Sequence, residues 1–165
     1  DYSHAGPSFD VAAYGELVAA CCRKLNRSLG RDINVVVEPG RAMTASCGTF
    51  LTRVIDIKML DDQCYTGVDA SIAVFPRPFH HPDSPHRIRL LSTAGPVDPD
   101  GLIIATKVVG RTTFSRDIIG STALPKLKVG NVLAVDDAGA YSQSMMSRFL
   151  GQVTPTSVYV SENDA

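Results

Sequence analysis

The chain has 165 residues, of which 44% are hydrophobic and 20% charged, and its formal net charge is −1 at pH 7. This length allows one sizeable core, or one domain with part of another, and the composition is that of an ordinary globular protein. The near-zero charge argues against a nucleic-acid or membrane partner held by bulk electrostatics, and the apolar runs are too short to span a bilayer. The four cysteines show no CxxC spacing, so we expect reduced thiols in a cytoplasmic protein.

The N-terminal part of the chain predicts a helix followed by a buried strand. Apolar residues recur at helical spacing over residues 11–29, with Ser8 as the expected N-cap, Asp10 in the first turn and Gly30 as the stop. Residues 33–37 are apolar without strict alternation, which indicates a strand buried on both faces. A helix followed by a strand is half of a parallel α/β unit and cannot bury its own faces. This part is therefore either a fragment of a larger α/β domain or docks elsewhere.

The four residues after the predicted strand combine three chemical features. Glu38 places a carboxylate at the end of the strand, where parallel α/β sheets keep their chemistry. Pro39 stiffens the turn, and Gly40 allows the backbone to approach a ligand closely. Arg41 adds a planar cation suited to phosphate or carboxylate. The alternative is an ordinary strand-end turn with a surface ion pair, because short motifs carry a real false-positive risk.

From Thr49 onward the pattern predicts a mostly β fold. Turn signals such as Asp100-Gly101 separate short segments rich in β-formers, which favours an antiparallel barrel or sandwich. Residues 42–48 read as a short helix or a linker, and residues 142–150 as the one late helical segment. The predicted strands cover residues 51–59, 87–91, 102–109, 129–135 and 157–160.

Several motifs occur in an order that resembles a known family. Glu-Pro-Gly-Arg at 38–41 is followed by Val-Asp-Ala at 68–70, Arg-Pro at 77–78 and Asp-Ala-Gly-Ala-Tyr-Ser at 137–142. In this order they resemble the C-terminal part of pyridoxal-phosphate decarboxylases of the ornithine/diaminopimelate type, on the diaminopimelate side. The resemblance implies that residues 1–45 are the remnant of a (β/α)8 barrel that carries the cofactor. Residues 46–165 would then be the C-terminal β domain, which completes the active site across a homodimer and acts on a small amino-acid substrate.

The resemblance also implies roles for individual residues. Glu38 would face the pyridine nitrogen of pyridoxal 5′-phosphate and keep it protonated, which improves the ring as an electron sink. Gly40 and Arg41 would bind the cofactor phosphate, and the Tyr141 hydroxyl would donate to it. Arg77 would lie on the substrate side and bind a carboxylate. The alternatives are a tyrosine at the rim of the core for Tyr141 and a surface charge for Arg77.

The chain departs from the family pattern at two positions of one stretch. Where the family has a proton-donating cysteine, this chain has Thr113, whose hydroxyl is a far poorer acid. Where the family has an acid for the distal amine of the substrate, this chain has Phe114, which offers an ammonium at most a cation–π contact. The alternative to an enzyme is therefore a non-catalytic regulatory homologue of the same fold.

A third departure concerns the lysine that anchors the cofactor covalently. In the family this lysine lies on an early barrel strand, and none of the five lysines of this chain matches its position. We therefore expect the chain to be the C-terminal fragment of a longer enzyme and to be inactive alone.

A histidine-rich stretch allows a separate hypothesis. His80, His81, Asp83 and His86 carry metal-binding groups, but four prolines between positions 76 and 85 predict a loop with little preset geometry. We expect an exposed loop here and no metal site.

Overall fold

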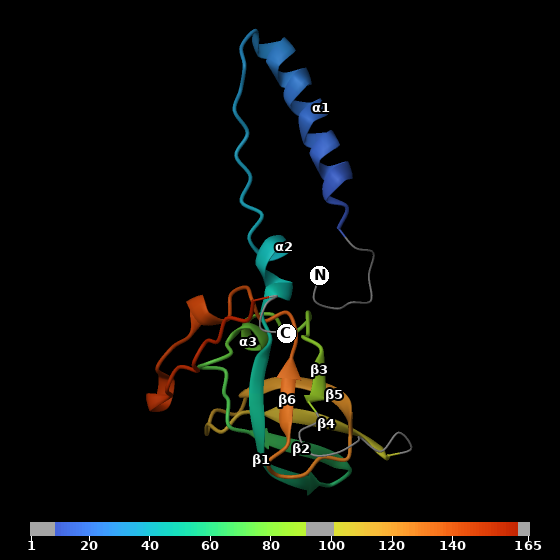
Figure 1. Ribbon diagram of the computed structural model, residues 1–165, viewed down its shortest axis with the longest axis vertical. Coiled ribbons are helices and arrows are strands. Elements are labelled where there is room, and N and C mark those ends of the chain that lie inside the picture. Colours follow the sequence, from blue (N-terminus) through green and yellow to red (C-terminus); the bar gives the residue numbers. More distant parts are fainter. Residues whose placement is uncertain (1–8, 92–100, 162–165) are drawn as a thin grey trace.

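The computed structural model describes residues 9–91 and 101–161, and shows a β domain from which an N-terminal arm extends (Figure 1). The arm contains helix α1 (Val11–Leu29) and an extended segment that leads to the short helix α2 (Arg41–Thr44). A second short helix, α3 (Arg77–His80), lies between strands, and 3-10 turns occur at Ala45–Cys47, Gln143–Met145 and Phe149–Gly151. The strands are β1 (Phe50–Leu60), β2 (Gln63–Val68), β3 (Ile88–Leu91), β4 (Ile103–Val109), β5 (Ile118–Pro125) and β6 (Val132–Val135).

The strands form one sheet in the order β3-β6-β1-β2-β4-β5. Every neighbouring pair is antiparallel except β2 and β4, which run parallel. A parallel pair needs a crossover connection, and this one carries α3 and β3. The two edge strands approach each other, because a β-carbon on Gly120 of β5 would lie 2.8 Å from Cδ1 of Ile88 in β3. The sheet is therefore a nearly closed barrel, as the sequence predicts.

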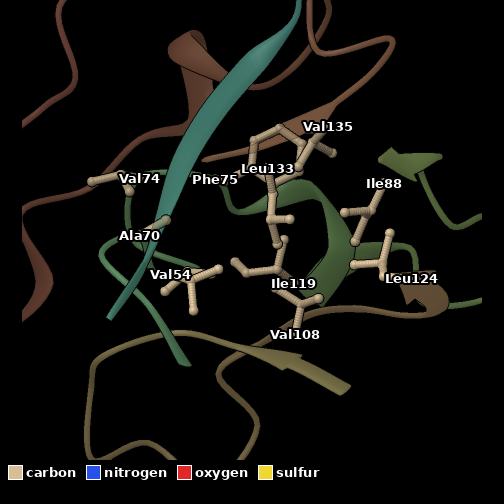
Figure 2. Close-up of a cluster of buried hydrophobic side chains, with 11 residues drawn as sticks. Val54, Ala70, Val74, Phe75, Ile88, Val108, Ile119, Leu124, Leu133 and Val135 are labelled. Carbon is tan, nitrogen blue, oxygen red and sulfur yellow. The ribbon is translucent and has the colours of Figure 1, made fainter. Parts of the chain in front are cut away.

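Buried apolar side chains from all six described strands, and from the crossover between β2 and β4, fill the interior of the barrel (Figure 2). Side chains alternate between the two faces of β1, so that Thr52 and Val54 are buried while Leu51 is exposed. A bulge between Val54 and Asp56 interrupts this alternation. The core consists of Val54, Val68, Ala70, Val74, Phe75, Ile88, Val108, Ile119, Leu124, Leu133 and Val135.

Helix α1 has the bounds that its apolar periodicity predicts. The carboxylate of Asp10, directly before the helix, accepts a hydrogen bond from the backbone NH of Ala13 at 2.9 Å, and the C-cap Gly30 has φ of 62°. Asp10 is thus the N-cap, whereas we expected this role for Ser8, which lies outside the described residues. None of the helix residues is buried, and Figure 1 shows the helix standing away from the sheet.

Two predicted strands are wrong. Residues 33–37 are extended but unpaired among the described residues, and Val36 is 85% exposed. Residues 157–160 are likewise not a strand, and Tyr159 is 90% exposed. Both segments have strand-forming side chains but no neighbouring strand in the described residues, and a strand gains its stability from such pairing.

The remaining predictions inside the domain differ in outcome. The strands expected at 51–59, 87–91 and 102–109 are confirmed, and β6 covers the last part of 129–135. Residues 42–48 contain α2 and a 3-10 turn, whereas 142–150 contains only short 3-10 turns in place of a helix. Strands β2 and β5 were not predicted. The inward face of β2 includes the polar Thr66, whose hydroxyl pairs with that of Thr106 at 2.8 Å, so its apolar alternation is weak.

Among the described helices, none is both long and apolar enough to cross a membrane.

Candidate functional site

The turn at residues 38–41 depends on the conformation of Gly40. This residue has φ of 40° and ψ of −107°, a backbone geometry that side chains disfavour. It lets the chain turn into α2, where the NH of Met43 donates to the Gly40 carbonyl at 3.1 Å. Glu38 and Arg41 flank this turn and are both exposed. The acid, the glycine and the arginine therefore surround one tight turn, as their spacing predicts.

The segment after this turn is joined to the Asp-Ala-Gly-Ala-Tyr-Ser segment at residues 137–142. The NH of Ala138 donates to the Gly48 carbonyl at 2.7 Å, and the NH of Gly139 donates to the Ala45 carbonyl at 2.9 Å. The backbones touch at two glycines, because a β-carbon on Gly48 would lie 2.6 Å from the Gly139 nitrogen. We call this contact the glycine junction. It requires glycine because no side chain fits between the two backbones.

The glycine junction brings Tyr141 to Gly40. A β-carbon on Gly40 would lie 3.5 Å from the Tyr141 hydroxyl. Tyr141 has φ of 59°, which is uncommon for a residue with a side chain, and it is 52% exposed. Its neighbour Ser142 is 5% exposed, and its hydroxyl has no hydrogen-bond partner among the described residues.

The structure places Arg77 inside the domain, at 1% exposure. Its Nη1 donates to the Ser84 carbonyl at 2.8 Å, and its Nη2 donates to the Ser84 hydroxyl at 3.2 Å. The alternative of a surface charge is therefore wrong. These bonds fold the segment after α3 back onto the helix, and they use donors that a substrate carboxylate would need. Carboxylate binding by Arg77 stays a prediction.

His86 is buried against Arg77 and Phe75, so the expectation of a wholly exposed histidine loop is wrong at this position. Its Nδ1 lies 2.8 Å from the Asp136 carbonyl and its Nε2 lies 3.2 Å from Arg77 Nη1. Because a carbonyl only accepts and a guanidinium only donates, the ring is neutral with its proton on Nδ1. Burial lowers the pKa of His86 below its ordinary value. The bond to Asp136 opposes this shift, and the charge of Arg77 supports it.

His80 and His81 are exposed, in contrast to His86. Within the described residues, no three histidine, cysteine, aspartate or glutamate side chains gather as metal ligands would.

The loop at residues 110–117 presents Thr113 and Phe114. Thr113 is exposed, and Phe114 is half-buried against Phe79, with ring centroids 5.7 Å apart. Sequence reasoning missed Asp117, which shapes this loop. It is 4% exposed, and its carboxylate accepts from the backbone NH groups of Ile72 at 2.7 Å and Thr112 at 3.0 Å, and from the Thr112 hydroxyl. The one available signal was an acid at the end of a polar loop that begins with glycine.

The geometry around Gly40 suits a phosphate ester. A backbone NH at a glycine turn, a guanidinium and a tyrosine hydroxyl are all donors, and phosphate oxygens accept strongly. A side chain at Gly40 would begin in van der Waals contact with the Tyr141 hydroxyl, and glycine avoids this contact. An exposed carboxylate at Glu38 lies within the same turn and could pair with a protonated ring nitrogen. These features make the turn at residues 38–41, together with Tyr141, a candidate site for a phosphate group.

The family comparison agrees with this class of site. A family profile described as "Pyridoxal-dependent decarboxylase, C-terminal sheet domain" matches residues 9–139. The chain therefore belongs to the pyridoxal-dependent decarboxylases and contains their C-terminal sheet domain.

Two curated relatives are diaminopimelate decarboxylases. The chain is 29% identical over 156 residues to diaminopimelate decarboxylase of Escherichia coli K12, covering 90% of this chain and 37% of that protein. It is 34% identical over 127 residues to diaminopimelate decarboxylase of Helicobacter pylori J99, covering 76% of this chain and 30% of that protein. The chain thus spans about a third of the length of these curated relatives.

Solved structures show the same fold. A crystal structure of diaminopimelate decarboxylase superposes with a TM-score of 0.83 at 28% identity, over 92% of this chain and 38% of that one. The Helicobacter pylori enzyme complexed with L-lysine gives a TM-score of 0.72 at 27% identity, over 90% of this chain and 34% of that one.

Proposed function

We propose that this chain is the C-terminal part of a longer pyridoxal-phosphate-dependent amino-acid decarboxylase that acts in the cytoplasm. Residues 1–45 would belong to the cofactor-binding α/β barrel and residues 46–165 to the β domain. The observation that carries the proposal is the approach of Tyr141 to Gly40 across the glycine junction. This approach gathers donors from two distant motifs into one site suited to phosphate, and a protein without cofactor has no evident use for it.

Four residues would hold pyridoxal 5′-phosphate. The Gly40 backbone NH and the Arg41 guanidinium bind the phosphate, and the Tyr141 hydroxyl donates a further hydrogen bond to it. Glu38 keeps the pyridine nitrogen protonated, because a carboxylate beside it favours the charged form. When bound, the cofactor supplies the electron sink for decarboxylation. The exposed faces of α1 and of residues 33–37 suit burial in the rest of such a barrel.

The β domain would complete the active site at a homodimer interface. In this arrangement the loop with Thr113 and Phe114 enters the site of the partner subunit. Thr113 stands where a proton donor is needed, and its hydroxyl is a weak acid, so we expect proton return to be slow without assistance. Phe114 cannot pair with a distal ammonium, and a buried unpaired charge is costly. The favoured substrate is therefore an amino acid, or a carrier-linked derivative of one, without a distal amine.

A non-catalytic regulatory homologue is the second candidate, and Thr113 with Phe114 is the observation that favours it. The test is release of carbon dioxide from a panel of amino acids by the full-length protein supplied with pyridoxal phosphate. The enzyme hypothesis expects turnover of at least one amino acid that lacks a distal amine. A protein that binds the cofactor but releases carbon dioxide from no member of the panel would support the regulatory homologue instead.

This chain alone is expected to be inactive. None of its lysines matches the family position of the covalent anchor. The isolated chain mixed with pyridoxal phosphate should therefore retain no borohydride-fixed label after dialysis. Stoichiometric label on one lysine would contradict this expectation.

A further inference from the structure

Phe114, in the loop at residues 110–117, gathers with two phenylalanine rings from other segments. The rings of Phe79 and Phe114 have centroids 5.7 Å apart, and those of Phe114 and Phe149 are 6.4 Å apart, both edge to face. We call these three residues the aromatic cluster. Phe79 comes from α3, and Phe149 from the segment that follows Tyr141. The backbone NH of Ser147 fixes this last segment by donating to the Ala73 carbonyl at 2.9 Å.

The guanidinium of Arg116 lies over the aromatic cluster. Its Cζ is 4.9 Å from the Phe79 ring centroid and 5.8 Å from that of Phe114. The side chain is exposed, and within the part of the chain that the structure describes it forms no ion pair. A cation–π contact does not occupy the guanidinium NH donors as a hydrogen bond or an ion pair would. The guanidinium of Arg116 is therefore held beside an apolar surface with NH donors that a ligand can bind.

Hydrogen bonds to Asp117 fix the loop that carries Phe114 and Arg116. Besides its carboxylate bonds to Ile72 and Thr112, the Asp117 carbonyl accepts from the Gly110 NH at 2.8 Å. A β-carbon on Gly110 would collide with the Asp117 carboxylate, so this corner of the loop also requires glycine. A loop held in this way loses little entropy when a ligand binds, which favours selective recognition.

We propose that Arg116 is a specificity residue that binds a distal anionic group of the substrate, while the aromatic cluster packs against its apolar stem. The substrate class is then an α-amino acid whose side chain ends in a carboxylate or a phosphate. This inference rests on the proposed function, because it takes the loop at 110–117 as part of an active site. It goes further in one respect: Phe114 only disfavours a distal ammonium, whereas Arg116 selects a negative charge.

The test compares three amino acids of equal chain length in the full-length protein: 2-aminoadipate, norleucine and lysine. We expect kcat/KM to be highest for 2-aminoadipate and lowest for lysine. Replacing Arg116 by Gln should lower kcat/KM for 2-aminoadipate by about tenfold or more, since a hydrogen-bonded charge is lost. The value for norleucine should change by less than about twofold, and Arg116→Lys should restore part of the loss. O-phosphoserine, assayed alongside, distinguishes a phosphate from a carboxylate as the preferred anion.

Two matched controls separate recognition from general damage. Arg53→Gln removes another exposed arginine, on β1, and should leave all three values unchanged. Arg111→Gln removes the other arginine of the same loop, whose Nε donates to Gln152 at 2.9 Å, and should affect all substrates alike.

Several results would overturn the assignment of Arg116. Preference for lysine or norleucine over both anionic amino acids would do so while leaving the decarboxylase intact. An equal loss for all substrates in Arg116→Gln would show a structural role, and no loss would show no role. Release of carbon dioxide from no amino acid at all would overturn the proposed function and this assignment together.

Discussion

Replacing Gly48 by Ala should destabilise the domain by disrupting the glycine junction. The new β-carbon would lie 2.6 Å from the Gly139 nitrogen and 2.7 Å from its Cα, and backbone atoms cannot rotate away as a side chain can. Overpacking of this kind costs about 1–3 kcal/mol. If the segment separates instead, the hydrogen bonds of Ala138 and Gly139 are lost, at about 1 kcal/mol each. Both routes give a loss of about 2 kcal/mol in the free energy of unfolding.

Urea unfolding of this chain, followed by circular dichroism, measures the effect. With a slope near 2 kcal/mol per molar urea, the midpoint should fall by about 1 M. The matched control is Gly15→Ala in α1, where no atom outside the neighbouring helix backbone lies within 4 Å of the added β-carbon. Because alanine favours a helix over glycine, this control should leave the midpoint unchanged or raise it. Equal midpoints for Gly48→Ala and the wild type would refute the claim that the junction excludes a side chain.

Four further predictions follow from the described contacts. Stability should fall as the pH drops below about 6.5, the ordinary pKa of histidine, and should go on falling until the pH passes the lowered pKa of buried His86, because the unfolded chain takes up the proton first. Replacing His86 by Gln should flatten this dependence in urea titrations at pH 5–8. Asp117→Asn should cost about 1–3 kcal/mol and speed amide exchange at Thr112, whereas unchanged exchange would contradict the role of this carboxylate. Limited proteolysis should cut the exposed residues 31–40 before the β domain, and early cleavage after position 100 would count against an independently stable domain. In the full-length protein Phe114→Glu should shift preference towards lysine, and an unshifted preference would remove Phe114 from the substrate site.

Local patterns in the sequence predicted the elements that carry a clear periodicity of their own. Helix α1 carries its own periodicity and its own stop at Gly30, and β1 alternates visibly. The run at residues 33–37 has the same apolar character, yet no strand forms, because strand formation depends on a partner strand that the pattern cannot report. Strand β2 was not predicted for a related reason. Its inward face contains the polar Thr66, whose hydroxyl is hydrogen-bonded to that of Thr106, a residue far away in the chain.

In the candidate site, too, local sequence predicts some features, and others depend on residues that are distant in the chain. The gathering of Glu38, Gly40 and Arg41 at one tight turn could be predicted from their adjacency in the sequence. The approach of Tyr141 to Gly40 was expected only from the family resemblance, because it depends on two glycines that are distant in sequence. The burial of Arg77 could not be predicted, since its partner Ser84 lies in a loop whose course no local pattern fixes.

The affinity of the full-length protein for pyridoxal 5′-phosphate tests the central claim most directly. Equilibrium dialysis should compare the wild type with Arg41→Gln and Tyr141→Phe, and with Tyr159→Phe as the control at a fully exposed tyrosine. If the two motifs bind the cofactor phosphate together, each site variant should raise the dissociation constant by about tenfold or more, and the control should leave it unchanged. Wild-type affinity in both Arg41→Gln and Tyr141→Phe would contradict the account.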